Sequence, residues 1–284
     1  MKFGATDAVF EGFRITRQKP VLLLWLSLVY AVTSAIAVAL AYQPFVQLME
    51  VVANIQSGQQ PDEAEAMKIM GAYGRVIIVA LPLSLIATAV TYPAVVRAIL
   101  TPEDSRFGYL RLGRDELNTF VVILALTVVW SAVILLAGGI VGVAAMGGMA
   151  AAMLVGLLVF CGVVAFAIWF GVKFSLAVPI TVAEKRIAIM DSFRMTKGHF
   201  WPLLGMAFLA GILSFGVNLL VNIISMPFAA ISGGGFGLLT GQGVTALTVT
   251  GFIGTVVLSL LMASAQALIL YAPFAAAYRM LKPN

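Results

Sequence analysis

Charged residues are scarce in this sequence, and their scarcity decides the class of protein. Of the 284 residues, 10% are charged and 62% are hydrophobic, and the mean hydropathy is +1.06. An average soluble domain is about 25% charged and about 45–50% apolar. A water-facing surface cannot be assembled from this composition, so lipid must form most of the protein's surroundings.

Cysteine and histidine are almost absent. The single cysteine, Cys161, excludes an intramolecular disulfide, and its place in an apolar run is typical of a small hydrophobic residue. The single histidine, His199, cannot supply the histidine and carboxylate sets of a metal centre or a metal-dependent hydrolase. We therefore expect no enzymatic activity, no metal and no other cofactor.

Long apolar runs are the main feature that is present. A helix needs about 20 mostly apolar residues to cross a bilayer. Six runs meet this requirement, at 21–42, 76–100, 118–142, 151–178, 202–230 and 246–278. They predict an all-α fold, in which residues 1–284 form one multi-pass membrane domain built as a six-helix bundle. Apolar residues at 45, 48, 49, 51 and 52 predict a further short helix between the first two spans.

Lysine and arginine are unevenly distributed between these runs. If the amino terminus is cytoplasmic, fifteen of the 17 lie on the cytoplasmic side, and only Lys68 and Arg75 lie outside. The positive-inside rule then predicts that both termini are cytoplasmic. Signal-peptide cleavage near Ala39–Ala41 is an alternative, but the apolar run is too long for a signal peptide and follows a segment with two acids.

A basic pentad occurs three times, as FRITR at 13–17, LRLGR at 110–114 and FRMTK at 193–197. Each pentad precedes two apolar runs, and the second run of each pair carries a proline near its cytoplasmic end: Pro93, Pro179 and Pro273. The pentad arginine and the proline are 79 positions apart in the first and third cases, and 68 apart in the second. We interpret this pattern as three repeated units, each a surface helix followed by a transmembrane hairpin. Chance similarity of short basic motifs is the alternative.

The segments around the pentads are expected to lie at the lipid headgroups. Phe3, Val9, Phe10 and Phe13 share one face of the first segment, and Ile187, Met190 and Phe193 share one face of the third. The second begins at Thr101 with Thr-Pro-Glu-Asp, which is typical of a helix start, and Gly113 is expected to end it.

The basic residues of the pentads would then lie at the level of the phosphates, where each contributes about 1 kcal/mol to binding an anionic leaflet. The predicted lipid-interface residues are Arg14, Arg17, Arg111, Arg114, Arg194, Lys197 and Trp201. Their placement predicts membrane lipids with anionic headgroups as partners and argues against nucleic acid.

One passage resembles a known family. The sequence Pro179-Ile-Thr-Val-Ala-Glu184, followed by Ser192-Phe-Arg-Met-Thr196-Lys-Gly198-His-Phe200-Trp201, is similar to the signature of the glycerophosphoryl diester phosphodiesterase membrane-domain family. The resemblance is specific over 179–201. It implies a multi-pass protein of the bacterial inner membrane and marks as family-motif residues Pro179, Glu184, Ser192, Thr196, Gly198 and Phe200. Some relatives carry a fused soluble phosphodiesterase, but this chain has no segment that could form one, so the family name does not imply that activity.

Three residues in this passage have expected physical roles. Pro179 should bend the fourth span, because it lacks an N–H donor and clashes with the preceding turn. Glu184 should pair with one of the nearby cations, Lys185, Arg186, Arg194 or Lys197. Trp201 should lie at the headgroup boundary.

The apolar runs contain no aspartate or glutamate, which disfavours proton-coupled transport through a buried acid. Asn218, Asn222 and Gln266 remain as a candidate buried polar cluster, which could line a pocket or form interhelical hydrogen bonds. We therefore predict a non-enzymatic membrane protein that binds or organises lipid, or scaffolds a partner, at the cytoplasmic face. A transporter or channel for a neutral or anionic solute is the alternative.

Overall fold

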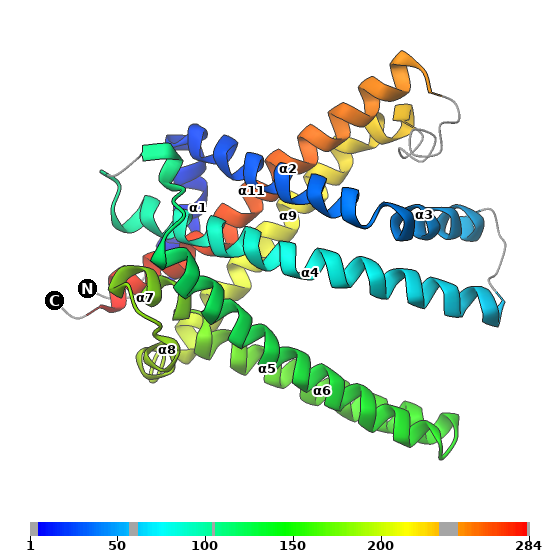
Figure 1. The fold of residues 1–284 in the computed structure, drawn as a ribbon. Helices are drawn as coiled ribbons and strands as arrows, with labels where there is room; N and C mark the ends of the chain where they lie inside the picture. Colours follow the sequence, from blue (N-terminus) through cyan, green and yellow to red (C-terminus); the bar gives the residue numbers. More distant parts are fainter. Residues whose placement is uncertain (1–4, 57–61, 104–105, 233–243, 283–284) are drawn as a thin grey trace. The chain divides into compact units, whose positions relative to one another are not determined.

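The computed structural model describes residues 5–56, 62–103, 106–232 and 244–282. Within these ranges all regular secondary structure is helical, and six helical segments are long and apolar enough to cross a membrane. They are α2 (Pro20–Leu40), α4 (Glu63–Leu100), α5 (Arg114–Ala145), α6 (Met149–Phe174) with its continuation, α9 (Phe200–Ser232) and α11 (Ala246–Leu281) (Figure 1). The protein is therefore an all-α, multi-pass membrane protein, as predicted.

Several helices extend beyond the predicted spans. α4 begins at Glu63 instead of residue 76, and α11 continues to Leu281. Hydropathy identifies only the apolar part of a helix. Backbone hydrogen bonding continues through polar residues such as Lys68, so the helix extends beyond that part. The expected short helix after the first span is α3 (Tyr42–Gln56).

The fourth span is interrupted near Pro179. α6 ends at Phe174, and α7 (Ala177–Glu184) begins after Ser175 and Leu176. A proline ring clashes with the carbonyl four residues earlier and offers it no N–H, and that carbonyl belongs here to Ser175. The break therefore agrees with the predicted effect of Pro179. By contrast, α4 and α11 continue through Pro93 and Pro273.

Two of the three expected surface helices are present, as α1 (Ala5–Gln18) and α8 (Ile189–Met195). The predicted face of α1 was partly wrong, because Val9 is buried whereas Phe10 and Phe13 are exposed. Phe3 lies outside the described residues. Of the residues predicted for the face of the third segment, Met190 and Phe193 are exposed on α8, and Ile187 is exposed just before the helix begins.

The second surface helix was predicted wrongly. In the described part of 101–113 the regular element is a short 3₁₀ turn, η1 (Arg106–Tyr109). Thr101 closes α4 instead of starting a helix, because its N–H and its hydroxyl both donate to the carbonyl of Arg97, at 2.8 and 3.2 Å. Gly113 precedes α5 instead of ending a helix, and its N–H donates to Glu116 Oε2 at 2.9 Å.

The chain divides into two compact units. Unit 1 comprises Met1–Arg14, Tyr92–Gly211 and Ile269–Asn284. In it α5 packs along α6, and α7 and α8 pack at the end of this hairpin that carries Arg114 and Phe174 (Figure 1). Tyr92 of α4 stacks on Tyr271 of α11, with ring centroids 4.2 Å apart, so two of the residues beside the repeated prolines meet.

Unit 2 comprises Ile15–Thr91 and Ile212–Leu268. In it the hydroxyls of Ser27 on α2 and Ser264 on α11 are 2.7 Å apart. The α9 and α11 segments also pack closely, because a Cβ placed on Gly251 would lie 2.9 Å from the carbonyl oxygen of Phe228. α4, α9 and α11 each contribute residues to both units. The division into units therefore neither confirms nor contradicts the prediction that residues 1–284 form one domain.

Candidate functional site

The described residues of unit 1 form three clusters of ion pairs, and in each cluster one cation follows one of the three repeated prolines. Arg97 follows Pro93, Arg186 follows Pro179, and Arg279 follows Pro273. Each arginine pairs with an acid of another segment of the unit. These clusters fix the segments that carry the pentads.

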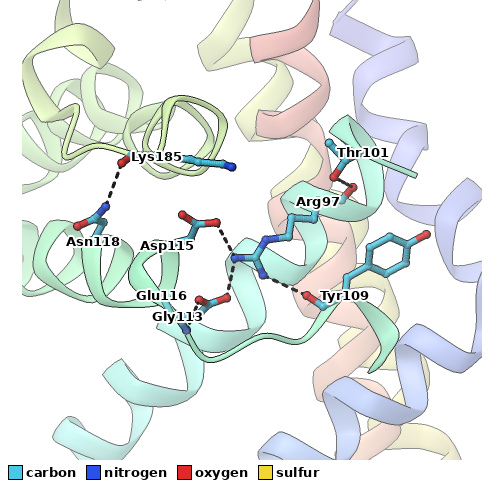
Figure 2. Close-up of polar contacts among 8 residues, drawn as sticks. All are labelled: Arg97, Thr101, Tyr109, Gly113, Asp115, Glu116, Asn118 and Lys185. Carbon is cyan, nitrogen blue, oxygen red and sulfur yellow. Dashed lines mark hydrogen bonds and ion pairs between the residues drawn. The ribbon is translucent and has the colours of Figure 1, made fainter. Parts of the chain in front are cut away.

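Arg97 lies at the centre of the first cluster, near the end of α4 (Figure 2). Its Nη1 donates to the carbonyl of Tyr109 at 3.1 Å, and its Nη2 donates to Asp115 Oδ2 at 3.2 Å. Nη2 also lies 2.7 Å from Glu116 Oε1, an ion pair without hydrogen-bond geometry. The side chains of Arg97 and Glu116 are only 8% and 7% exposed, so this pair is nearly dry.

The geometry explains how the second pentad segment is held without a helix. Glu116 accepts the Gly113 N–H through its other oxygen, which places the start of α5 beside Arg97. Tyr109 has a positive φ of 66°, and its hydroxyl donates to the carbonyl of Pro102 at 2.8 Å. One arginine thus joins the end of α4, the turn at Tyr109 and the start of α5.

Arg186 lies in the second cluster, between two carboxylates. It pairs with Glu184 at the end of α7 and with Asp191 of α8, the latter at 2.7 Å. Hydrogen bonds with Asp191 and then with Glu184 raise the pKa of Arg186. The predicted pairing of Glu184 with a nearby cation is therefore present, with Arg186 as the partner.

Glu11 is the shared acid of the third cluster. It is buried, and its Oε1 lies 2.9 Å from Arg14 Nη2 and 3.9 Å from Arg279 Nη2. Glu11 precedes the pentad arginine Arg14 by three positions, as Asp191 precedes Arg194. The first and third pentad segments thus share one arrangement. In each, an acid three positions before the pentad arginine pairs with a cation that follows a repeated proline. This arrangement supports the interpretation of internal repeats, which stays a prediction.

Two buried hydroxyls attach α8 to the end of α6. Ser192 Oγ donates to the carbonyl of Lys173 at 2.9 Å, and Thr196 Oγ1 lies 3.4 Å from the same carbonyl and 3.2 Å from the carbonyl of Phe193. Both side chains are fully buried. Lys173 Nζ in turn lies 4.9 Å from the ring centroid of Phe193. Ser192 and Thr196 therefore position α8, because a carbonyl near a helix end otherwise lacks an intrahelical donor.

The other motif residues shape the two ends of this segment. Pro179 is buried in α7. Gly198 has a positive φ of 90° in the turn between α8 and α9, a conformation that favours glycine. Phe200 begins α9 and lies edge-on to Trp201, with ring centroids 5.6 Å apart.

We call the outward-facing side chains of residues 187–201 the α8 surface. Its cations are Arg194, with a side chain that is 82% exposed, and Lys197, which is also exposed. Its large apolar side chains are Ile187, Met190, Phe193 and Trp201, all exposed. The four other predicted lipid-interface residues, Arg14, Arg17, Arg111 and Arg114, are exposed as well.

The candidate buried polar cluster is not formed within the chain. Asn218 and Asn222 are exposed on α9, and Gln266 on α11 is half-buried. Asn222 Nδ2 donates to the carbonyl and to the side-chain oxygen of Asn218, at 2.8 and 2.9 Å. The two asparagines are thus brought together, but on an outward face instead of in the interior.

Arg97, Asp115 and Lys173 were missed as site residues. A partial signal for the first cluster was the Asp-Glu pair after Gly113, since a glutamate three residues into a helix often accepts the N–H of its cap. No comparable signal pointed to Lys173. Among the described residues, no three His, Cys, Asp or Glu side chains are grouped so that they could hold a metal ion.

Comparisons with known proteins add no identity to this geometry. No protein-family model matches the chain, and neither the curated proteins nor the solved structures contain a match to it. The resemblance of residues 179–201 to the membrane-domain family stays a prediction, and what the chain is shown to be is a six-span, all-α membrane protein.

Proposed function

We propose that this is a non-enzymatic protein of the bacterial inner membrane that binds anionic lipid at its cytoplasmic face through the α8 surface. The observation that carries the proposal is the combination of exposed cations with exposed large apolar side chains on one short segment, residues 187–201. Such a segment can insert its apolar side chains among the acyl chains while its cations contact phosphate.

The charges of the segment support a phosphate-binding role for two particular residues. Arg186 is neutralised by Glu184 and Asp191, whereas Arg194 lies 3.9 Å from Asp191 and is mostly exposed. Lys197 is exposed in the turn that follows α8. Arg194 and Lys197 are therefore the cations that a lipid headgroup could reach with least competition from protein carboxylates.

The attachment of α8 also supports binding of lipid at a defined position. Because Ser192 and Thr196 hold α8 on the Lys173 carbonyl, the exposed residues keep a constant register relative to α6. A cation fixed in this way loses less conformational entropy on binding than one on a free segment.

The test uses a double variant that carries both Arg194→Ala and Lys197→Ala. The double variant is compared with the parent protein in bilayers that mix anionic and zwitterionic lipid. Each lost charge should cost about 1 kcal/mol, so the double variant should bind anionic lipid about 30-fold more weakly than the parent. Native mass spectrometry of the released complexes measures the retained lipid. The matched control is Lys68→Ala with Arg75→Ala, which removes equal charge near the start of α4 and should leave lipid retention unchanged.

Equal retention by the α8 variant and the parent would contradict the proposal, and the α8 surface would then be a docking face for a protein partner. The transporter alternative rests on the repeat and on the proline-interrupted spans, and a polar cavity through Asn218, Asn222 and Gln266 would have favoured it. Both asparagines are exposed, so they do not supply such a cavity, and the transporter stays an alternative.

A further inference from the structure

One face of α9 in unit 2 is apolar, exposed and regularly spaced. Its residues recur at alternating steps of three and four positions, and all are exposed: Ile212, Phe215, Leu219, Asn222 and Met226. We call this set the α9 stripe. Alternation of three and four keeps side chains along one line of a helix and is the spacing with which helices pack in a coiled-coil seam.

The asparagines give this face an unmet polar requirement. Asn222 uses its side-chain nitrogen on Asn218, one turn earlier. Within the described part of the chain, the side-chain nitrogen of Asn218 donates no hydrogen bond and the side-chain oxygen of Asn222 accepts none. One donor group and one acceptor are therefore left exposed on the surface of unit 2.

Their position along α9 makes this requirement costly. Asn218 lies 18 residues after Phe200 and 14 before Ser232, so at 1.5 Å per residue it is about 27 and about 21 Å from the two helix ends. The hydrocarbon core is about 30 Å thick, so a helix that crosses it places Asn218 inside. Lipid tails offer no hydrogen-bond partner, and amides left without one at that depth are strongly disfavoured.

We propose that a second copy of this chain covers the α9 stripe and forms a homodimer in which the asparagine amides of the two copies hydrogen-bond to each other. A two-fold axis brings the same patch of both copies together. The free donor of one copy then meets the free acceptor of the other, because an amide pair is self-complementary. An asparagine within a seam of large apolar residues is also a known determinant of helix register and partner number.

Cysteine cross-linking in native membranes tests this geometry. The natural Cys161 is exposed and is first replaced by serine. Leu219→Cys then places a thiol on the α9 stripe, and Leu220→Cys is its control, since Leu220 is also exposed and lies at the same depth but points about 100° away. Oxidation should yield a disulfide-linked dimer of the chain for Leu219→Cys and little for Leu220→Cys.

A second measurement tests the amides themselves. Asn222→Leu should raise the dissociation constant of the dimer, measured by fluorescence energy transfer on dilution in lipid, by about tenfold, within the range found for hydrogen bonds between membrane helices. Asn222→Gln should recover part of this loss.

Equal cross-linking at both cysteine positions, no change on removal of the Asn222 amide, or cross-linking at Leu219→Cys only to a protein of different mass would each overturn the proposal. None of these measurements involves the α8 surface, so the dimer and the lipid-binding proposal fail or stand separately.

Discussion

Replacing Arg97 with methionine should destabilise the protein strongly, because it leaves two carboxylates together without their cation. Glu116 is 7% exposed, and its Oε1 lies 2.7 Å from Arg97 Nη2. At an effective dielectric constant of about 20, unit charges at that separation attract by about 6 kcal/mol, much of which offsets the cost of removing them from water. Loss of one partner from a buried pair typically costs about 3–5 kcal/mol, and we expect a loss in this range for Arg97→Met.

Glu116→Gln should cost less than Arg97→Met. Asp115 remains as a counter-ion for Arg97, and the glutamine oxygen can still accept the Gly113 N–H. The double variant removes both charges of the closest pair, so its loss should be smaller than the sum of the single losses by about 0.5–3 kcal/mol.

The assay is equilibrium unfolding in mixed detergent micelles. Protease cleavage within 101–113 is a second readout, because Arg97 also holds the carbonyl of Tyr109. Arg194→Met is the control, since its side chain is 82% exposed and lies 3.9 Å from Asp191, so the free energy of unfolding should hardly change. Strictly additive losses, or an Arg97→Met variant as stable as the control, would refute the assignment of a buried pair.

Two further predictions concern packing and topology. Gly251→Ala should lower the free energy of unfolding by about 1–3 kcal/mol, because the new Cβ would lie 2.9 Å from the Phe228 carbonyl oxygen and 3.0 Å from the Ser232 nitrogen. The control Gly216→Ala should be neutral, because its Cβ meets no atom within 4 Å. Equal losses of the two variants in detergent unfolding would contradict this prediction. Reporter fusions after residues 60 and 240 should report the periplasm, and fusions after 108, 190 and 284 the cytoplasm, because the lysines and arginines lie mostly on one side of the spans. A periplasmic reporter signal after residue 284 would overturn the orientation.

The spans could be predicted from the sequence because each is a local property. About 20 apolar residues identify a membrane-crossing helix whatever its neighbours are. The ends were less accurate, as α4 shows, because hydropathy falls at Glu63–Arg75 while the helix continues. The break before α7 was also predictable, since Pro179 acts on the turn beside it.

The second surface segment shows where local patterns are ambiguous. Thr-Pro at 101–102 is common where a helix starts, but the same pair also follows a helix end, since proline cannot continue it. The contact that decides between these cases joins Arg97 to Glu116, 19 positions later. The charges were visible in the sequence, but their pairing depends on how the ends of α4 and α5 pack, which no local pattern specifies.

The candidate site was predictable in part for the same reason. The exposed residues of the α8 surface follow from the apolar and basic residues gathered in one short segment, residues 187–201. The attachment of α8 to Lys173 does not, because Ser192 and Thr196 donate to a carbonyl about 20 positions earlier. The amides of Asn218 and Asn222 were recognised, but their outward direction depends on which face of α9 the neighbouring helices cover.

The contact between Glu11 and Arg279 restricts the number of times the chain can cross the bilayer. These residues lie on the first and last described helices, and their charged atoms are 3.9 Å apart. Two points on opposite sides of the membrane would be separated by at least the hydrocarbon core, about 30 Å. The path from Glu11 to Arg279 must therefore leave and return to the same side, so only an even number of crossings is allowed. A single span that failed to insert would break this parity and place Arg279 on the opposite side of the membrane from Glu11, so this ion pair could not form.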